Sequence, residues 1–78
     1  MKNKYGGVKI FMYYIGDRVK IVENLQELKD NGKDITPEML EYAGMYGIIM
    51  VRFAGVNTNR YLLNVDNKEW LWPENLLY

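Results

Sequence analysis

The reactive side chains of this chain are few, and their types restrict the chemistry available to it. Histidine, cysteine and serine are absent, so the usual zinc sites and general base catalysis by histidine are excluded. Two carboxylate pairs lie close together along the chain: Glu38 with Glu41, and Asp30 with Asp34. We interpret them as solvated side chains, because a general acid needs burial or a forced like-charge pair to raise its pKa. With no Gly-rich phosphate loop, the sequence predicts a protein that is not an enzyme and holds no metal or cofactor.

Aromatic residues form a second candidate set. The chain has 7 Tyr, 2 Trp and 2 Phe, more than a small core needs, so some of these rings are expected to stay exposed. Exposed aromatic side chains anchor protein interfaces. We predict that three of them bind a partner protein: Tyr42, Tyr46 and Tyr78. The leading expectation for function is therefore a non-catalytic protein-interaction module.

A third candidate set consists of four basic residues on predicted strands: Arg18, Lys20, Arg52 and Arg60. If all four lie on one sheet face among aromatic rings, they hold a nucleic-acid strand by charge and stacking. The alternative function is therefore a small nucleic-acid-binding domain. Ordinary solubilising side chains, paired across strands with Glu23 or Glu69, explain the same residues. The formal net charge is zero, so we expect no long-range electrostatic attraction of the domain to nucleic acid. A self-associating structural subunit is a second alternative.

Short alternating segments predict the strands that carry these residues. They are residues 18–22, 47–53, 60–65 and 70–72. The predicted inward side chains are Val19 and Ile21, then Ile49, Val51 and Phe53, then Tyr61, Leu63 and Val65, with one face of the Trp70–Trp72 pair. Asp66–Glu69 is a predicted tight turn. Pro73 ends the last strand, because it has no N–H to donate to a sheet.

Two helical pieces are predicted in the long segment between the first two strands. The first begins at Asn24, whose side chain is expected to cap it, and stops at Gly32. The second covers residues 37–43, with Thr36 as its cap and Gly44 as the residue after it. Its apolar stripe is too short to stand alone, so this helix must lie on the sheet.

Residues 1–11 stand apart from the single domain expected over residues 12–78. Gly6-Gly7-Val8 is what GGA-GGT-G would encode, a string that resembles a bacterial ribosome-binding site placed just before Met12. In one interpretation, translation naturally begins at Met12, and residues 1–11 are a non-native or disordered leader. Removing its three lysines leaves seven basic against ten acidic residues, a net charge of −3. In the other interpretation, Val8–Tyr14 is a genuine first strand.

Five segments in this order resemble a group of small SH3-like proteins of bacteria and their phages or prophages. The segments are Gly16-Asp-Arg-Val-Lys-Ile-Val22, Glu38-Met-Leu-Glu-Tyr-Ala-Gly44, Gly47-Ile-Ile, Tyr61-x-Leu and Trp70-x-Trp-x-Glu-Asn-Leu76. The resemblance runs from Ile15 to Leu77. It implies a mainly β fold with a short helix: an SH3-like small barrel of about five strands, with a helical excursion in the long loop after the first barrel strand. It also implies a phage or prophage accessory protein that binds a host protein.

Two better-known relatives differ from this chain at informative positions. Eukaryotic-type SH3 domains bind Pro-rich peptides with a Tyr in a Pro-x-Asn-Tyr turn, whereas Pro73-Glu-Asn75 is followed here by Leu76. KOW-type modules are similar in the Gly-Asp-x-Val opening but work in basic surroundings. We therefore interpret the C-terminal segment as a closing strand and core lock, and expect the recognition surface elsewhere.

The bulk composition indicates the compartment. With no cysteine, disulfides are excluded, which is typical of a reducing cytoplasm. No apolar run approaches the roughly 20 residues of a membrane span. We expect a cytoplasmic protein of a bacterial host cell, with no membrane partner.

Overall fold

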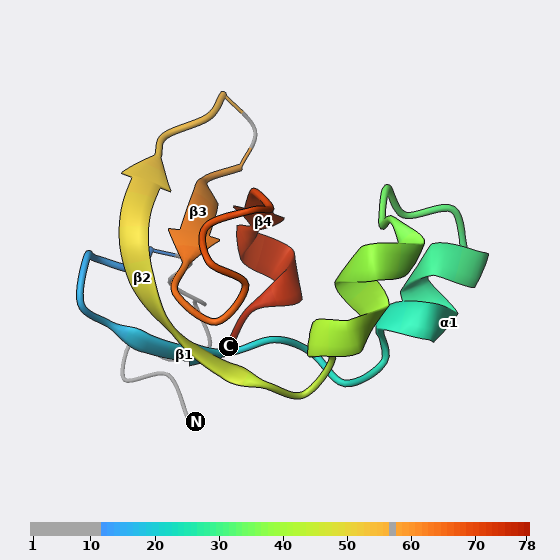
Figure 1. Ribbon diagram of the computed structural model, residues 1–78. Coiled ribbons are helices and arrows are strands. Elements are labelled where there is room, and N and C mark those ends of the chain that lie inside the picture. The colour runs from blue at the N-terminus through green and yellow to red at the C-terminus, as the bar shows by residue number, and fades with distance from the viewer. Residues whose placement is uncertain (1–11, 57) are drawn as a thin grey trace, which may run out of the picture.

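Four short strands form one antiparallel sheet in the computed structural model, which describes residues 12–56 and 58–78. They are β1 (Arg18–Lys20), β2 (Tyr46–Phe53), β3 (Arg60–Leu63) and β4 (Trp72–Pro73), paired in that order. The sheet curls around its inner face like half a barrel (Figure 1). The expectation of a small, mainly β protein with short helices is confirmed. The leader of residues 1–11 lies outside the described residues, and residues 12–14, the described end of the alternative first strand, are not in a strand.

The C-terminal residues return to pair with the end of β1. After the short 3₁₀ helix η2 (Glu74–Leu76), Leu77 forms an isolated antiparallel bridge with Ile21. The Lys20 N–H donates to the Tyr78 carbonyl at 2.7 Å, and the Tyr78 N–H donates to the Lys20 carbonyl at 2.9 Å. In Figure 1 the end marked C therefore lies beside β1. This pairing joins residues almost sixty positions apart in the sequence.

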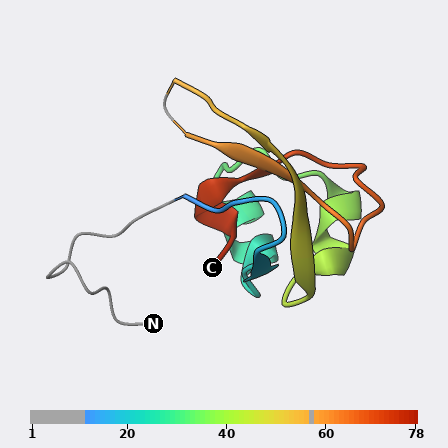
Figure 2. The same ribbon diagram turned by 90° about the vertical axis from the view of Figure 1, so that its left-hand side faces the viewer.

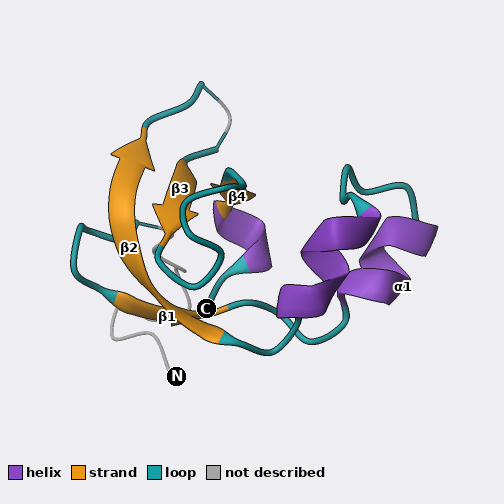
Figure 3. Ribbon diagram, viewed as in Figure 1, coloured by secondary structure: helices purple, strands orange, loops and turns teal. Residues whose placement is uncertain are grey.

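The segment between β1 and β2 carries two short helices, as expected from the sequence. They are α1 (Leu25–Asp30) and the 3₁₀ helix η1 (Pro37–Tyr42), which lie together at one end of the molecule (Figure 3). The sequence favoured residues 37–43 as the regular helix, and the structure makes it the tighter 3₁₀ form. Its N–H groups donate to carbonyls three residues back, as from Ala43 to Leu40 at 3.2 Å. A segment this short, held between Pro37 and the left-handed Gly44 (φ 78°), suits three residues per turn.

The predicted start and stop signals of α1 have different outcomes. Gly32 has φ 92° and directly follows the C-cap residue, so the predicted left-handed stop is confirmed. The predicted cap at Asn24 is wrong, because its side chain accepts no hydrogen bond from the helix backbone. Its amide instead donates to the Glu27 carboxylate at 3.4 Å. α1 therefore begins without a side-chain cap, and its first residue, Leu25, is buried in the core.

The core fills the concave face of the curled sheet. Its largest fully buried side chains are Trp72, Tyr61, Ile21, Leu25, Ile49, Leu63, Leu77 and Val19. Leu25, Ile35 and Met39 of the excursion belong to the same buried cluster as the inward side chains of the strands, so the excursion shares one core with the sheet. The Trp72 indole N–H donates to Asp66 Oδ2 at 2.9 Å. Trp72 is therefore both apolar filling and a hydrogen-bonded link to the turn before β4.

A register shift in β2 changes which side chains face the core. Ile49 lies opposite Leu63, but Val51 lies opposite Leu62, so β2 holds one extra residue between these pairs. Beyond the shift the alternation is reversed. Phe53 is 47 % exposed, so its predicted inward position is wrong. Figure 2 shows β2 bending across the molecule toward the β2–β3 loop.

The turn between β3 and β4 confirms the predicted tight turn at Asp66–Glu69. Asn67 and Lys68 have φ of 57° and 59°, and the Glu69 N–H donates to the Asp66 carbonyl at 3.2 Å. Two positive φ values in the central residues are those of a type I′ turn. The buried Asp66 carboxylate also accepts the Trp70 N–H at 3.0 Å. This side chain thus fastens the turn to both tryptophans.

Candidate functional site

Strand pairing gathers four of the predicted site residues on the outer face of the sheet. Arg18 and Lys20 are two residues apart on β1, so their side chains leave the same face about 7 Å apart. Tyr46 of β2 lies directly opposite Lys20, and Tyr78 pairs with Lys20 on its other side. We call the four residues Arg18, Lys20, Tyr46 and Tyr78 the aromatic–basic patch.

The cations of this patch lie over its rings. The Arg18 guanidinium carbon is 4.3 Å from the centroid of the Tyr46 ring. The Lys20 ammonium is 5.5 Å from the Tyr46 centroid and 5.9 Å from the Tyr78 centroid. All three distances fall within the range of cation–π attraction. Tyr46 is 54 % and Tyr78 57 % exposed, so about half of each side chain faces solvent.

The two cations differ in how far their charge is already neutralised. The Lys20 ammonium donates to the Glu23 carboxylate at 2.5 Å. This hydrogen bond raises the pKa of Lys20 and lowers the pKa of Glu23 from their ordinary values. Within residues 12–56 and 58–78, no carboxylate lies within ion-pair distance of Arg18. Arg18 is therefore the cation of the patch that has charge to offer a ligand.

A small hollow of about 140 Å³ adjoins the patch. It is lined by Arg18, Tyr46, Gly47, Ile48 and Asn64. The Asn64 Oδ1 accepts the Ile48 N–H at 2.8 Å, which holds the amide at the edge of the hollow. Gly47 is closely packed, because a Cβ there would lie 3.1 Å from Val65 Cγ1.

The structure separates the remaining candidates from the patch. Tyr42 is half-buried, and its ring meets the buried Trp72 ring edge-on at 6.3 Å. Arg52 lies opposite Tyr61, so the register shift places it on the core face, over the Tyr14 ring at 5.5 Å. The prediction that Arg52 shares a face with the other cations is therefore wrong.

The fourth predicted cation also lies apart from the patch. Arg60 is opposite Phe53, seven residues along β2 from Tyr46 and roughly 23 Å away at the rise of a strand. Only Arg18 and Lys20 of the four predicted cations therefore come together. Tyrosines and cations that the sequence assigned to two different functions form one surface.

Some surface features were not predicted from the sequence. Met45, just before β2, and Met50, within β2, are 44 % and 41 % exposed. Tyr14, 57 % exposed, forms a second pair of an aromatic ring with an arginine. Whether a side chain near a bulge or a strand end is exposed depends on cross-strand register, which local alternation does not contain.

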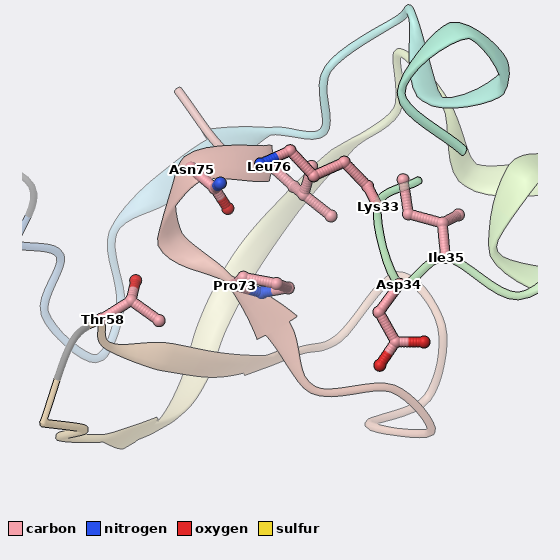
Figure 4. A pocket seen from close by; sticks show the side chains of 7 residues that line it. All are labelled: Lys33, Asp34, Ile35, Thr58, Pro73, Asn75 and Leu76. Atoms are coloured by element: carbon pink, nitrogen blue, oxygen red, sulfur yellow. The ribbon is translucent and has the colours of Figure 1, made fainter. Parts of the chain in front are cut away.

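A larger groove of about 340 Å³ lies on another side of the molecule (Figure 4). It is lined by Lys33, Asp34, Ile35, Thr58, Pro73, Asn75 and Leu76. The Lys33 side chain reaches toward η2, whereas the Asp34 carboxylate points away from it (Figure 4). The C-terminal segment, interpreted from sequence as a core lock, thus also forms one wall of a groove. None of these seven lining residues is aromatic.

The polar groups of the interior serve the fold. Glu74 and Asp66 are the buried carboxylates among the described residues, and each accepts hydrogen bonds from neighbouring side chains. Burial raises the pKa of the Tyr61 hydroxyl, which donates to Glu74. Within the described ranges there is no group of three or more acidic residues that could hold a metal ion.

Comparison of the chain with protein-family models, with curated proteins and with solved structures found no match. In the part of the chain that the structure describes, no helix combines the length and apolar character needed to cross a membrane.

Proposed function

We propose that the chain is a non-catalytic protein-interaction module that binds its partner through the aromatic–basic patch. The observation that carries this proposal is the stacking of Arg18 on the half-exposed Tyr46 ring at 4.3 Å. Tyr, Met and Arg are enriched in the cores of protein interfaces. Tyrosine also supplies a large contact area for little loss of side-chain entropy. Here Tyr46 and Tyr78 offer that area beside Arg18 and Lys20.

We also propose that the fold is an SH3-like small barrel. Support comes from the strand order β1–β2–β3–β4 and from the pairing of residues 77 and 78 with the end of β1. The position of the helical excursion between β1 and β2 fits as well. Because barrels of this kind carry unrelated functions, the fold adds no weight to a particular partner.

A nucleic-acid partner is the weaker alternative. Binding to phosphates needs several uncompensated cations along one track, whereas Lys20 is engaged by Glu23, and Arg52 and Arg60 lie apart. Two phosphate contacts on a single strand would lower affinity about sevenfold between 50 and 200 mM salt. A tyrosine-anchored protein interface would change far less over the same range.

The proposal is tested by selecting binders from a displayed library of peptides and comparing two tyrosine variants. Tyr46→Ala should abolish binding, because it removes the ring on which Arg18 stacks. Tyr14→Ala is the matched control, since Tyr14 has similar exposure and its own arginine at 5.5 Å. Both variants should unfold at the same temperature as the parent chain. Binders that are equally affected by the two substitutions, or the absence of any binder, would contradict the proposal.

A further inference from the structure

We infer that the partner segment bound by the aromatic–basic patch carries a carboxylate that pairs with Arg18, next to an apolar side chain that enters the adjoining hollow. This inference rests on the proposed function and specifies the chemistry of the partner. Three features of the patch support it: the availability of the Arg18 guanidinium, the size and lining of the hollow, and the charge around both.

The first feature is the way the Tyr46 ring presents Arg18. The guanidinium is planar and carries its five N–H donors in that plane. Its central carbon is 4.3 Å from the centroid of the Tyr46 ring, so contact with this ring positions the guanidinium beside β2. Among the described residues no carboxylate takes these donors. A fork of parallel N–H groups matches a carboxylate with two hydrogen bonds, so the ligand group is an acid.

The second feature is the hollow beside this fork. At about 140 Å³ it is well below the roughly 300–1,000 Å³ of small-molecule and cofactor pockets. It has room for one side chain. Tyr46, Gly47 and the half-buried Ile48 line it together with Arg18 and Asn64, so the hollow offers apolar contact to a side chain and polar groups beside it.

The rim of the hollow can also bind a peptide backbone. The Asn64 amide uses its oxygen on the Ile48 N–H. Within the described part of the chain, its Nδ2 donates no hydrogen bond. That group is available to a backbone carbonyl of the bound segment. A peptide with an acidic residue beside an apolar one binds the Arg18 guanidinium, the hollow and the Asn64 amide together.

The third feature is the charge around the patch, which favours one carboxylate over a polyanion. Glu23 neutralises Lys20 and has a side chain that is 66 % exposed. Its negative charge therefore faces any second anion that approaches Lys20. The chain as a whole has a formal net charge of zero. A ligand with one acidic group at Arg18 avoids this repulsion, whereas a run of phosphates does not.

The test begins with random 12-residue peptides displayed and selected on the full chain at 150 mM salt. We expect the peptides that depend on Tyr46 to be enriched in Asp or Glu next to Leu, Ile, Val or Met. The strongest peptide is then synthesised with its acidic residue and with the matching amide. Changing Glu to Gln, or Asp to Asn, in the peptide should weaken binding about 10- to 100-fold, as for loss of a charged hydrogen bond.

Arg18→Gln should weaken binding of the acidic peptide by the same factor. The variant should bind the acidic peptide and the amide peptide with equal affinity. This non-additivity assigns the carboxylate to Arg18. Arg18→Lys should recover part of the affinity, because the charge remains while the fork is lost. Arg52→Gln, at the arginine that stacks on Tyr14, should leave binding unchanged.

Four results would overturn the inference. Tyr46-dependent peptides without an acidic residue would refute it while leaving the proposed function intact. Additive losses from Arg18→Gln and from the amide peptide would place the carboxylate elsewhere. Tighter, Arg18-dependent binding of an oligothymidylate than of any selected peptide would make the ligand a nucleic acid. If no Tyr46-dependent peptide is selected at all, the proposed function and this inference are both refuted.

Discussion

The hydroxyl of Tyr61 donates a hydrogen bond to Glu74 Oε1 at 2.7 Å, and both side chains are buried. The same hydroxyl accepts the backbone N–H of Tyr13 at 3.1 Å, and the two tyrosine rings meet edge-on at 5.6 Å. One oxygen atom therefore links β3, η2 and the segment before β1. Within the described residues the Glu74 carboxylate has no cation as its partner. The carboxylate is held instead by neutral donors, the Tyr61 hydroxyl and the Asn59 amide at 3.4 Å.

Tyr61→Phe should destabilise the fold by about 1.5–3 kcal/mol, because it leaves a buried carboxylate short of a donor. The free energy of unfolding is measured by urea denaturation. Tyr13→Phe is the control: its hydroxyl makes only a 3.3 Å bond to the Leu77 carbonyl, and its loss should cost about 0.5–1 kcal/mol. Equal decreases in the free energy of unfolding of the two variants would show that the Tyr61–Glu74 hydrogen bond stabilises the fold no more than the Tyr13–Leu77 one does.

The same bond predicts a loss of stability at alkaline pH. Burial and the neighbouring Glu74 hold the pKa of the Tyr61 hydroxyl above its ordinary value of 10.0. The folded state thus favours the protonated form. Its stabilising contribution is complete below pH 10 and is lost as the pH rises toward the folded-state pKa. The urea concentration at the midpoint of unfolding should decrease as the pH is raised above 10. Tyr61→Phe should make this decrease smaller. An identical alkaline slope in the variant would contradict the linkage.

Trp72→Ala should unfold much of the population. The cost of removing a buried tryptophan is roughly 3–5 kcal/mol, and a chain of this length has a total stability of roughly 4–12 kcal/mol. The substitution also removes the indole donor from Asp66. Circular dichroism and a thermal melt measure the result. Leu71→Ala, at a neighbour that is 46 % exposed, should change the melting temperature little. A folded Trp72→Ala protein with an unchanged melt would refute its role in the core.

Lys68→Gly should stabilise the turn between β3 and β4. Lys68 has φ 59°, a left-handed conformation that costs a residue with a side chain about 1–2 kcal/mol and glycine almost nothing. The greater entropy of glycine in the unfolded chain offsets part of this gain, so we expect a net increase of about 0.5–1 kcal/mol. Thermal unfolding measures it. Glu69→Gly has no such strain to relieve, because φ at this position is not positive, and it should leave the protein less stable.

Much of the secondary structure could be predicted from local sequence. Alternation placed Val19, Ile21, Tyr61 and Leu63 correctly, since side chains two residues apart on a strand share a face. Asp66–Glu69 and Gly32 were predicted correctly because turns and helix ends are determined by a few neighbouring residues. The candidate site was predicted only in part: Tyr46 and Tyr78 are exposed, but Tyr42 packs on Trp72.

The sequence by itself thus determined the curled, mainly β class of fold, the inward sides of its short strands and the presence of more aromatic rings than the core requires. Tertiary structure alone decided where the extra residue enters β2, and with it the faces of Arg52 and Phe53. It also decided that Tyr78 lies beside Lys20, and that Arg18 stacks on Tyr46. The physical reason is how far apart in the sequence the interacting residues lie. Turn geometry and alternation depend on neighbours in the chain, whereas register and strand partners are set by packing between segments far apart in the sequence.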